Sequence, residues 1–122
     1  MLHQFSRTEL AIGPEGLDVL KKSTVAVLGI GGVGSIAAEA LARTGIGRIV
    51  MIDKDVVDIT NINRQIHALM TTIGQPKAEL MRERILQINP ECDAVALKMF
   101  YTEETYERLF EYPLDYVIDA SD

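Results

Sequence analysis

The chain has 122 residues, 48% of them hydrophobic and 25% charged, with a formal net charge of −6 at pH 7. This length suits one modest domain that buries roughly two-thirds of its unfolded surface. The acidic balance argues against a nucleic acid held by this segment alone, because phosphate-backbone binding needs clustered Lys and Arg, and the 12 basic residues are dispersed.

The sequence also lacks the marks of a membrane or secreted protein. Its longest apolar runs are far below the ~18 residues of a membrane-spanning helix, and no signal peptide opens the chain. The single cysteine, Cys92, excludes an internal disulfide framework and fits a reducing compartment. We therefore expect a cytoplasmic protein without a membrane-spanning segment.

Apolar periodicity and turn residues predict alternating helices and strands. In the first half of the chain we expect a helical arm over residues 1–12, a turn at 13–16, a brief helix, a strand over 24–29, a helix over 33–44 and a strand over 48–53. An irregular segment over 54–75 follows. In the second half we expect a helix over 76–88, a strand over 93–99, a helix after Thr102 and a buried strand over 114–119. Gly45 should end the second helix in the left-handed conformation, and Pro76 should start the third. This order predicts an α/β fold with a Rossmann-like, doubly wound, mainly parallel sheet.

Two features of the chain's organisation point beyond a simple domain. The irregular segment 54–75 is long for a connection in an α/β fold, which suggests function. The last expected strand is followed by only a few residues, ending at Asp122, where such a sheet should continue. We expect residues 1–122 to be an N-terminal piece of a longer protein.

The segment 29–34, Gly-Ile-Gly-Gly-Val-Gly, joins the first strand to a helix. Its glycines allow a tight turn and let backbone N–H groups approach a phosphate, while the helix behind supplies the positive end of a dipole. The second strand ends on Asp53, where a ribose-binding carboxylate is expected. These features predict a nucleotide site, with a mere tight connection as the alternative.

The usual ligand of such a turn is NAD, but three features favour a triphosphate. The turn is richer than the minimal pattern, with Ser35 after its last glycine, and the segment 61–65 offers Asn and Arg donors to phosphate oxygens. Lys77 falls in the first turn of a helix, where a cation opposes the dipole by ~0.3–1 kcal/mol unless an anion binds. An attacked triphosphate needs fixed cations, whereas hydride transfer does not. A solvated loop and an ordinary exposed lysine remain the alternatives for these residues.

Acidic residues at strand ends are candidates for a metal or a ribose. Asp119 and Asp122 lie at the end of the last expected strand, and a carboxylate there can hold Mg²⁺. Asp53, Asp55 and Asp58 cluster in the sequence, which leaves a metal site open, although we favour Asp53 on ribose hydroxyls and the other two as polar loop groups. Cys92 has no neighbouring His in the sequence and is expected to be inert.

These residues together resemble the ubiquitin-activating-enzyme-like (ThiF/MoeB/HesA) adenylyltransferases. The matching motifs, in order, are Gly29-x-Gly31-Gly32-x-Gly34-Ser35, Asp53, Asn61-Ile62-Asn63-Arg64-Gln65, Gly74-Gln75-Pro76-Lys77 and Asp119-Ala120-Ser121-Asp122. Within the family, the stretches 5–10, 53–55, 89–92 and 98–106 are most similar to the tRNA threonylcarbamoyladenosine dehydratase branch.

The resemblance implies a role for each matching residue. ATP would be bound by the residues Gly29, Gly31, Gly32, Gly34, Asp53, Asp55, Asn61, Asn63, Arg64, Gln65, Lys77 and Asp122. Asp53 would hold the ribose, Asn61, Arg64 and Lys77 the triphosphate, and Asp122 would coordinate Mg²⁺. Arg7 would reach the ATP of a partner subunit, which predicts a homodimer with shared sites; Arg7, Arg64 and Lys77 would be the catalytic residues.

The implied reaction is ATP-dependent adenylation of a carboxylate, most similar to that of threonylcarbamoyladenosine in tRNA, bound by regions outside this segment. The alternative substrate is the C-terminal glycine of a ubiquitin-like sulfur carrier. A non-catalytic nucleotide-binding module and an NAD-dependent oxidoreductase are further alternatives. Family members are at least twice as long, so we expect this segment alone to be inactive.

Overall fold

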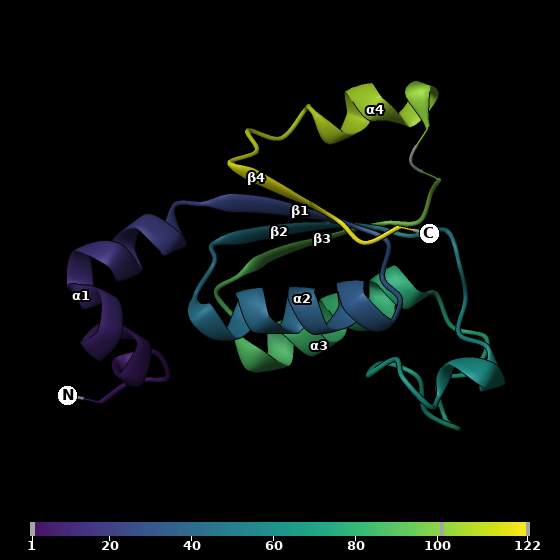
Figure 1. The fold of residues 1–122 in the computed structure, drawn as a ribbon, viewed down its shortest axis with the longest axis horizontal. Helices are drawn as coiled ribbons and strands as arrows, with labels where there is room; N and C mark the ends of the chain where they lie inside the picture. Colours follow the sequence, from purple (N-terminus) through teal and green to yellow (C-terminus); the bar gives the residue numbers. More distant parts are fainter. Residues whose placement is uncertain (1, 101, 122) are drawn as a thin grey trace.

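A four-stranded parallel sheet forms the centre of the computed structural model, which describes residues 2–100 and 102–121 (Figure 1). The elements in chain order are α1 (Ser6–Lys21), β1 (Thr24–Leu28), α2 (Gly32–Thr44), β2 (Arg48–Ile52), the 3₁₀ turn η1 (Ile59–Asn61), α3 (Lys77–Ile88), β3 (Asp93–Leu97), α4 (Glu103–Leu109) and β4 (Tyr116–Asp119). The alternation expected from the sequence is therefore confirmed.

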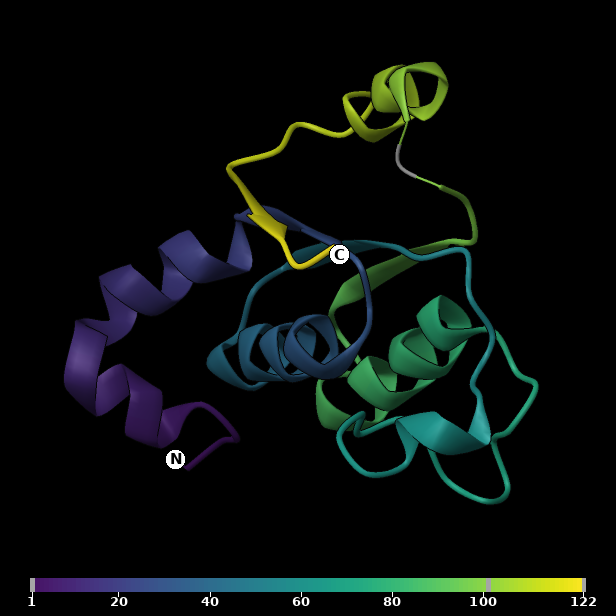
Figure 2. The same ribbon diagram turned by 45° about the vertical axis from the view of Figure 1, so that its right-hand side comes forward.

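The strands are parallel and lie in the order β3-β2-β1-β4. The chain winds outward from β1 to β3 and then crosses back to place β4 on the other side of β1. Helices α2 and α3 lie on one face of the sheet and α4 on the other (Figures 1 and 2). This arrangement confirms the α/β, Rossmann-like, doubly wound fold. Such sheets bind ligands at the carboxyl ends of the strands where the winding direction reverses, here between β1 and β4.

The core has two parts because neighbouring residues of a strand face opposite sides of the sheet. Val25 and Val27 of β1 belong to the cluster that faces α2 and α3, together with the fully buried Met81 and Ile85. The intervening residues of β1 join a second cluster, which includes Leu109 of α4. All five residues of β1 are buried, and the strand pairs with both β2 and β4, so the Gly-rich turn starts from the centre of the sheet.

Helix α1 lies at the amino ends of the strands, away from the edge where they finish (Figure 1). It is broken at Gly13, whose φ of 78° and ψ of 166° are not helical, in agreement with the turn expected at residues 13–16. Phe5 and Leu17 are buried beside Gly45. Gly45 ends α2 with φ 100° and ψ 21°, as predicted. Within the described residues, no helix combines the length and apolar character needed to cross a membrane.

The prediction of a strand over residues 114–119 is confirmed, but the prediction that this strand is buried is wrong. The strand exists as β4 and pairs with β1, but Tyr116 is 67% and Val117 39% exposed. Ile118 is the residue that packs against the core beside α2. Because β4 is at an edge of the described sheet, its remaining side chains lack cover there, and apolar composition does not reveal a strand's place in a sheet.

Close contact between β1 and α2 depends on the missing side chain of Gly34. A Cβ atom at this position would lie 1.7 Å from the carbonyl oxygen of Gly29. At Gly32, by contrast, the nearest atom would be Cγ of Arg64 at 3.6 Å, which is ordinary contact. The first turn of α2 can therefore approach the end of β1 only with glycine at position 34.

We predict that Gly34→Ala lowers the free energy of unfolding by about 3 kcal/mol or more, since the added methyl must displace backbone. Urea unfolding of Gly34→Ala and of the control Gly32→Ala measures this. The control should lose less than about 1 kcal/mol, because its methyl has space. Equal losses in the two variants would contradict the role given to Gly34.

Candidate functional site

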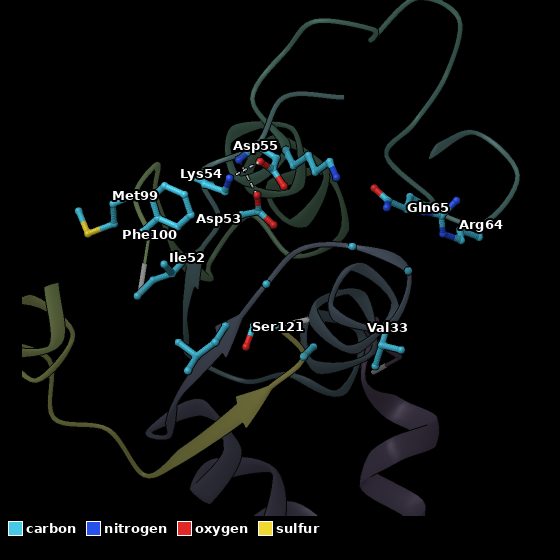
Figure 3. A pocket seen from close by; sticks show the side chains of 16 residues that line it. Val33, Ile52, Asp53, Lys54, Asp55, Arg64, Gln65, Met99, Phe100 and Ser121 are labelled. Carbon is cyan, nitrogen blue, oxygen red and sulfur yellow. Dashed lines mark hydrogen bonds and ion pairs between the residues drawn. The ribbon is translucent and has the colours of Figure 1, made fainter. Parts of the chain in front are cut away.

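A cavity of about 710 Å³ opens at the carboxyl edge of the sheet (Figure 3). It is lined by Leu28, Gly29, Gly31, Gly32, Val33, Ile52, Asp53, Lys54, Asp55, Arg64, Gln65, Lys77, Met99, Phe100, Ala120 and Ser121. These residues come from the ends of β1, β2 and β4, from the Gly-rich turn and the start of α2, from the segment between β2 and α3, from the segment after β3 and from the start of α3. The volume is that of a typical small-molecule site.

The Gly-rich turn forms one wall of this cavity and leads into the first turn of α2. Gly29 has a φ of 86°, and a Cβ atom there would meet the carbonyl oxygen of Ala120 at 2.9 Å. Gly31 precedes α2, whose first turn has no side-chain cap. Among the described residues, the N–H of Gly31 has no hydrogen-bond acceptor. The positive end of the α2 dipole therefore borders the cavity, where an anion would be stabilised.

Asp53 lies at the end of β2 and ties two loops together. Its Oδ2 accepts a hydrogen bond of 2.7 Å from the N–H of Ile30, and its Oδ1 accepts one of 2.7 Å from the N–H of Asp55. Each carboxylate oxygen has a second lone pair, so Asp53 can also accept hydrogen bonds from ligand hydroxyls. Asp55 borders the same cavity and forms an ion pair of 3.5 Å with Lys54.

Lys77 is the first residue of α3 and is only 7% exposed. Pro76, with ψ of 128°, is the N-cap, so the helix begins one residue later than expected. Among the described residues, no carboxylate lies within 4.0 Å of the Lys77 Nζ atom. The stem of Lys77 is buried, while its unpaired ammonium borders the cavity at the start of a helix, where the dipole opposes a positive charge. An anion in the cavity would remove this penalty.

Arg64 and Gln65 reach the cavity from the segment between β2 and α3 (Figure 3). The Arg64 NH1 group donates to the carbonyl of Thr60 at 3.0 Å and to Oδ1 of Asn63 at 2.9 Å, which orients the guanidinium. Gln65 is 6% exposed, and its Oε1 atom has no hydrogen-bond partner among the described residues. The Arg64 guanidinium thus offers N–H groups that a polar ligand can use, while the Gln65 Oε1 atom is buried.

The segment that carries these residues is tied at its two ends. Val56 and Pro76 form an isolated bridge, and the N–H of Val57 donates to the carbonyl of Gln75 at 2.9 Å. The N–H of Lys77 donates to the carbonyl of Asp55 at 3.0 Å. The segment leaves and returns at nearly one point, which keeps Asp55 and Lys77 adjacent.

The opposite wall of the cavity is apolar. Leu28 and Ile52 end β1 and β2, and Met99 and Phe100 follow β3. The Lys54 Nζ atom lies 4.0 Å from the centre of the Phe100 ring, a cation–π contact. Sequence reasoning missed Lys54, Met99 and Phe100, although residues after β3 must reach the same edge as those after β2 in a parallel sheet. This wall can cover the flat face of a base.

Three of the expected site residues do not line the cavity. Asn61 is buried, and its Oδ1 accepts a hydrogen bond of 2.8 Å from the N–H of Asp58, which fixes η1. Asn63 orients Arg64, and Gly34 provides the contact between α2 and β1. These three residues therefore position the residues that line the cavity. Their direct contact with a ligand stays a prediction.

Two further expected residues are Arg7 and Asp122. Arg7 is exposed on α1, at the opposite end of the strands from the cavity (Figure 1). Asp122, the expected Mg²⁺ ligand, falls outside the described residues. Within residues 2–100 and 102–121, no group of three or more His, Cys, Asp or Glu side chains is placed to hold a metal ion.

Residues 5–122 match the ThiF family, and the chain belongs to that family. It is 75% identical over all 122 residues to the tRNA threonylcarbamoyladenosine dehydratase of Bacillus subtilis (strain 168), of which it covers 48%. The family resemblance expected from the sequence is thereby confirmed.

A solved structure and a more distant relative extend this likeness. The crystal structure of E. coli tRNA N6-threonylcarbamoyladenosine dehydratase in complex with ATP has a TM-score of 0.94 and 50% identity, covering 98% of this chain and 49% of that one. The sulfur carrier protein adenylyltransferase of Thermus thermophilus is 34% identical over 91% of this chain, and 41% of that protein is covered. The chain spans about half the length of the curated relatives it matches.

We predict that Lys77→Met raises the free energy of unfolding by about 1 kcal/mol without ligand and weakens ATP binding at least about tenfold. The first effect follows from removing an unpaired charge that opposes the dipole of α3, and the second from losing a phosphate partner. Chemical unfolding and calorimetric titration measure the two. The exposed control Lys21→Met should change neither by a comparable amount, and a large loss of stability in Lys77→Met would contradict this view of the site.

Cys92 lies outside the cavity lining and is 4% exposed. Burial raises the pKa of its thiol to about 11, and the charge of Asp93 acts in the same direction. At pH 8 the thiol is therefore protonated and shielded. We predict that iodoacetamide modifies Cys92 of the folded protein at least about a hundred times more slowly than in urea, measured by mass spectrometry. Similar rates would show that this thiol is reactive.

Proposed function

We propose that this chain is the ATP-binding part of an enzyme that adenylates a carboxylate, namely that of threonylcarbamoyladenosine in tRNA, and so forms the cyclic, dehydrated nucleoside. The observation that carries the proposal is the 75% identity, over the whole chain, to a relative named for that reaction. The structure of the E. coli relative with ATP supports the ligand. In this proposal residues 1–122 belong to a larger, cytoplasmic enzyme.

The cavity fits a nucleoside triphosphate in its chemistry. The unpaired ammonium of Lys77 and the free N–H of Gly31, both among the described residues, are suited to phosphate oxygens. Asp53 would accept hydrogen bonds from the ribose, and the apolar wall with Phe100 would cover the base. Arg64 would share the charge of the phosphates with Lys77, because its guanidinium is already oriented by Thr60 and Asn63.

In the proposed reaction the substrate carboxylate attacks the α-phosphorus of ATP, and the bond to pyrophosphate breaks. Negative charge then grows on the departing phosphate oxygens. Lys77 and Arg64 lower this barrier because their charges are fixed before the reaction starts, so no reorganisation is needed. A nucleophile of the same nucleoside then displaces AMP and closes a ring, so that the nucleoside loses one water in total.

Mg²⁺ would neutralise phosphate charge during this reaction, with Asp122 as its ligand. Mg²⁺ is commonly held by one or two carboxylates together with substrate phosphates, so a single aspartate near a triphosphate suits it. We also propose a homodimer in which Arg7 contacts the nucleotide of the partner subunit. The exposure of Arg7 on α1, far from the cavity of its own chain, supports that role (Figure 1).

A sulfur carrier protein is the second candidate substrate. The 34% identity to the sulfur carrier protein adenylyltransferase of Thermus thermophilus favours it, since the first half-reaction would be the same. The carboxylate would then be a C-terminal glycine rather than a nucleoside side chain. In the tRNA proposal, the net charge of −6 argues that tRNA would be bound outside these residues.

The full-length protein, incubated with ATP, Mg²⁺ and tRNA containing threonylcarbamoyladenosine, should remove one water from that nucleoside, detected by mass spectrometry after digestion. Lys77→Ala and Arg64→Ala should each slow the reaction at least about a hundredfold, as expected for fixed charges at a developing anion. Lys21→Ala is the matched control. No loss of water, with ATP–pyrophosphate exchange on a sulfur carrier instead, would favour the second candidate; no reaction with either would leave a nucleotide-binding module.

A further inference from the structure

His67 lies directly behind the Gly-rich turn and has no place in the function proposed above. The residue is 4% exposed, and its Nε2 atom is 2.8 Å from the carbonyl oxygen of Ile30. The other ring nitrogen, Nδ1, is buried and has no hydrogen-bond partner among the described residues. A buried imidazole with one used and one unused nitrogen calls for a physical explanation.

The contact defines the protonation state of the ring. A carbonyl oxygen can only accept a hydrogen bond, so Nε2 carries the proton and donates it to Ile30. Burial is the main cause that lowers the pKa of His67, and the charges of Lys77 and Arg84 add to it, while the Ile30 carbonyl and Asp53 oppose it. The neutral ring with a bare Nδ1 is therefore the form present at pH 7.

Ile30 is held from three sides. Its N–H donates to Asp53 at 2.7 Å, its carbonyl accepts from His67, and its side chain is fully buried. Across a trans peptide bond, the carbonyl of one residue and the N–H of the next point in opposite directions. Because His67 draws the Ile30 carbonyl inward, the N–H of Gly31 must point away from His67, and Gly31 lines the cavity.

We infer that His67 is a positioning residue, which by holding the Ile30 carbonyl turns the Gly31 N–H toward the phosphates of the bound nucleotide. The inference rests on the proposed function in that the nucleotide is ATP. Without the bond from His67, the peptide between Ile30 and Gly31 can rotate, and the N–H no longer has a fixed direction. His67 therefore affects phosphate binding without touching the ligand.

The test compares two ligands in the full-length protein. His67→Leu fills a similar volume but has no donor, so its affinity for ATP should fall about tenfold, the effect of one hydrogen bond to a charged group. Its affinity for adenosine should stay within about twofold, because adenosine lacks phosphates. His67→Gln, which places an N–H donor at a similar reach, should restore most of the ATP affinity. Isothermal titration calorimetry of the unaltered protein and the two variants provides these affinities.

A control separates positioning from general destabilisation. Ile85→Val removes a methylene from the core cluster that also contains Ile30, and it should lower stability without changing the ratio of ATP to adenosine affinity. Equal losses for ATP and adenosine in His67→Leu, or no rescue by His67→Gln, would overturn the inference. So would an unchanged ATP affinity in His67→Leu.

A measurement on the unaltered protein remains available if His67→Leu fails to fold. In ¹⁵N spectra of the histidine side chains, His67 should show a neutral ring protonated at Nε2 at pH 7 and above; a neutral ring protonated at Nδ1 would overturn the inference. The affinities and the NMR measurement do not depend on whether the protein converts a substrate. A protein that binds ATP with the predicted His67 effect but acts on neither tRNA nor a carrier would refute the proposed function and leave the role of His67 intact.

Discussion

The site depends on the approach of α2 to the end of β1, where the backbone of Gly29 comes so close that residue 34 has no room for a side chain. This contact determines where the first turn of α2 starts and which way its free N–H groups point. It also leaves space for Ala120, after β4, to pass beside Gly29. The chemistry of the cavity is thus a consequence of backbone packing before any charged side chain takes part.

Two kinds of surface meet in the cavity, and they have different origins. The cationic side combines the amino ends of α2 and α3 with Lys77 and Arg64, which concentrates positive potential where water is partly excluded. The apolar side consists of strand ends and of Phe100. Asp53 and Asp55 also line the cavity, but neither forms an ion pair with Lys77 or Arg64 among the described residues, so a ligand that brings negative charge would stabilise this side.

The alternation of strands and helices could be predicted because apolar periodicity, Gly45 and Pro76 act locally. The candidate site was partly predictable, since the Gly-rich turn, Asp53 and Lys77 stand at element ends that a parallel sheet brings together. Phe100 was missed because its contribution depends on which strand lies beside β2, a non-local fact.

The exposure of β4 and the local bonding of Asn61 were also beyond sequence reasoning, and for the same kind of cause. An apolar strand has the same sequence pattern at the centre and at the edge of a sheet, so the exposure of Tyr116 could not be predicted from the sequence. Asn61 has a side chain suited to a phosphate, but in the structure its Oδ1 accepts a hydrogen bond from Asp58. Which partner a polar side chain takes is decided by the folded neighbourhood.

The tied ends of the segment between β2 and α3 have an evolutionary consequence. Since Val56 bridges Pro76 and Asp55 bonds to Lys77, the stretch around residues 69–73 can change length without moving either end. Lengthening a flexible loop is cheap, about 0.6 kcal/mol for each doubling. Exposed Leu69 and Met70 lie on this stretch, so its outer surface is free to diversify while the chemistry beneath it stays the same.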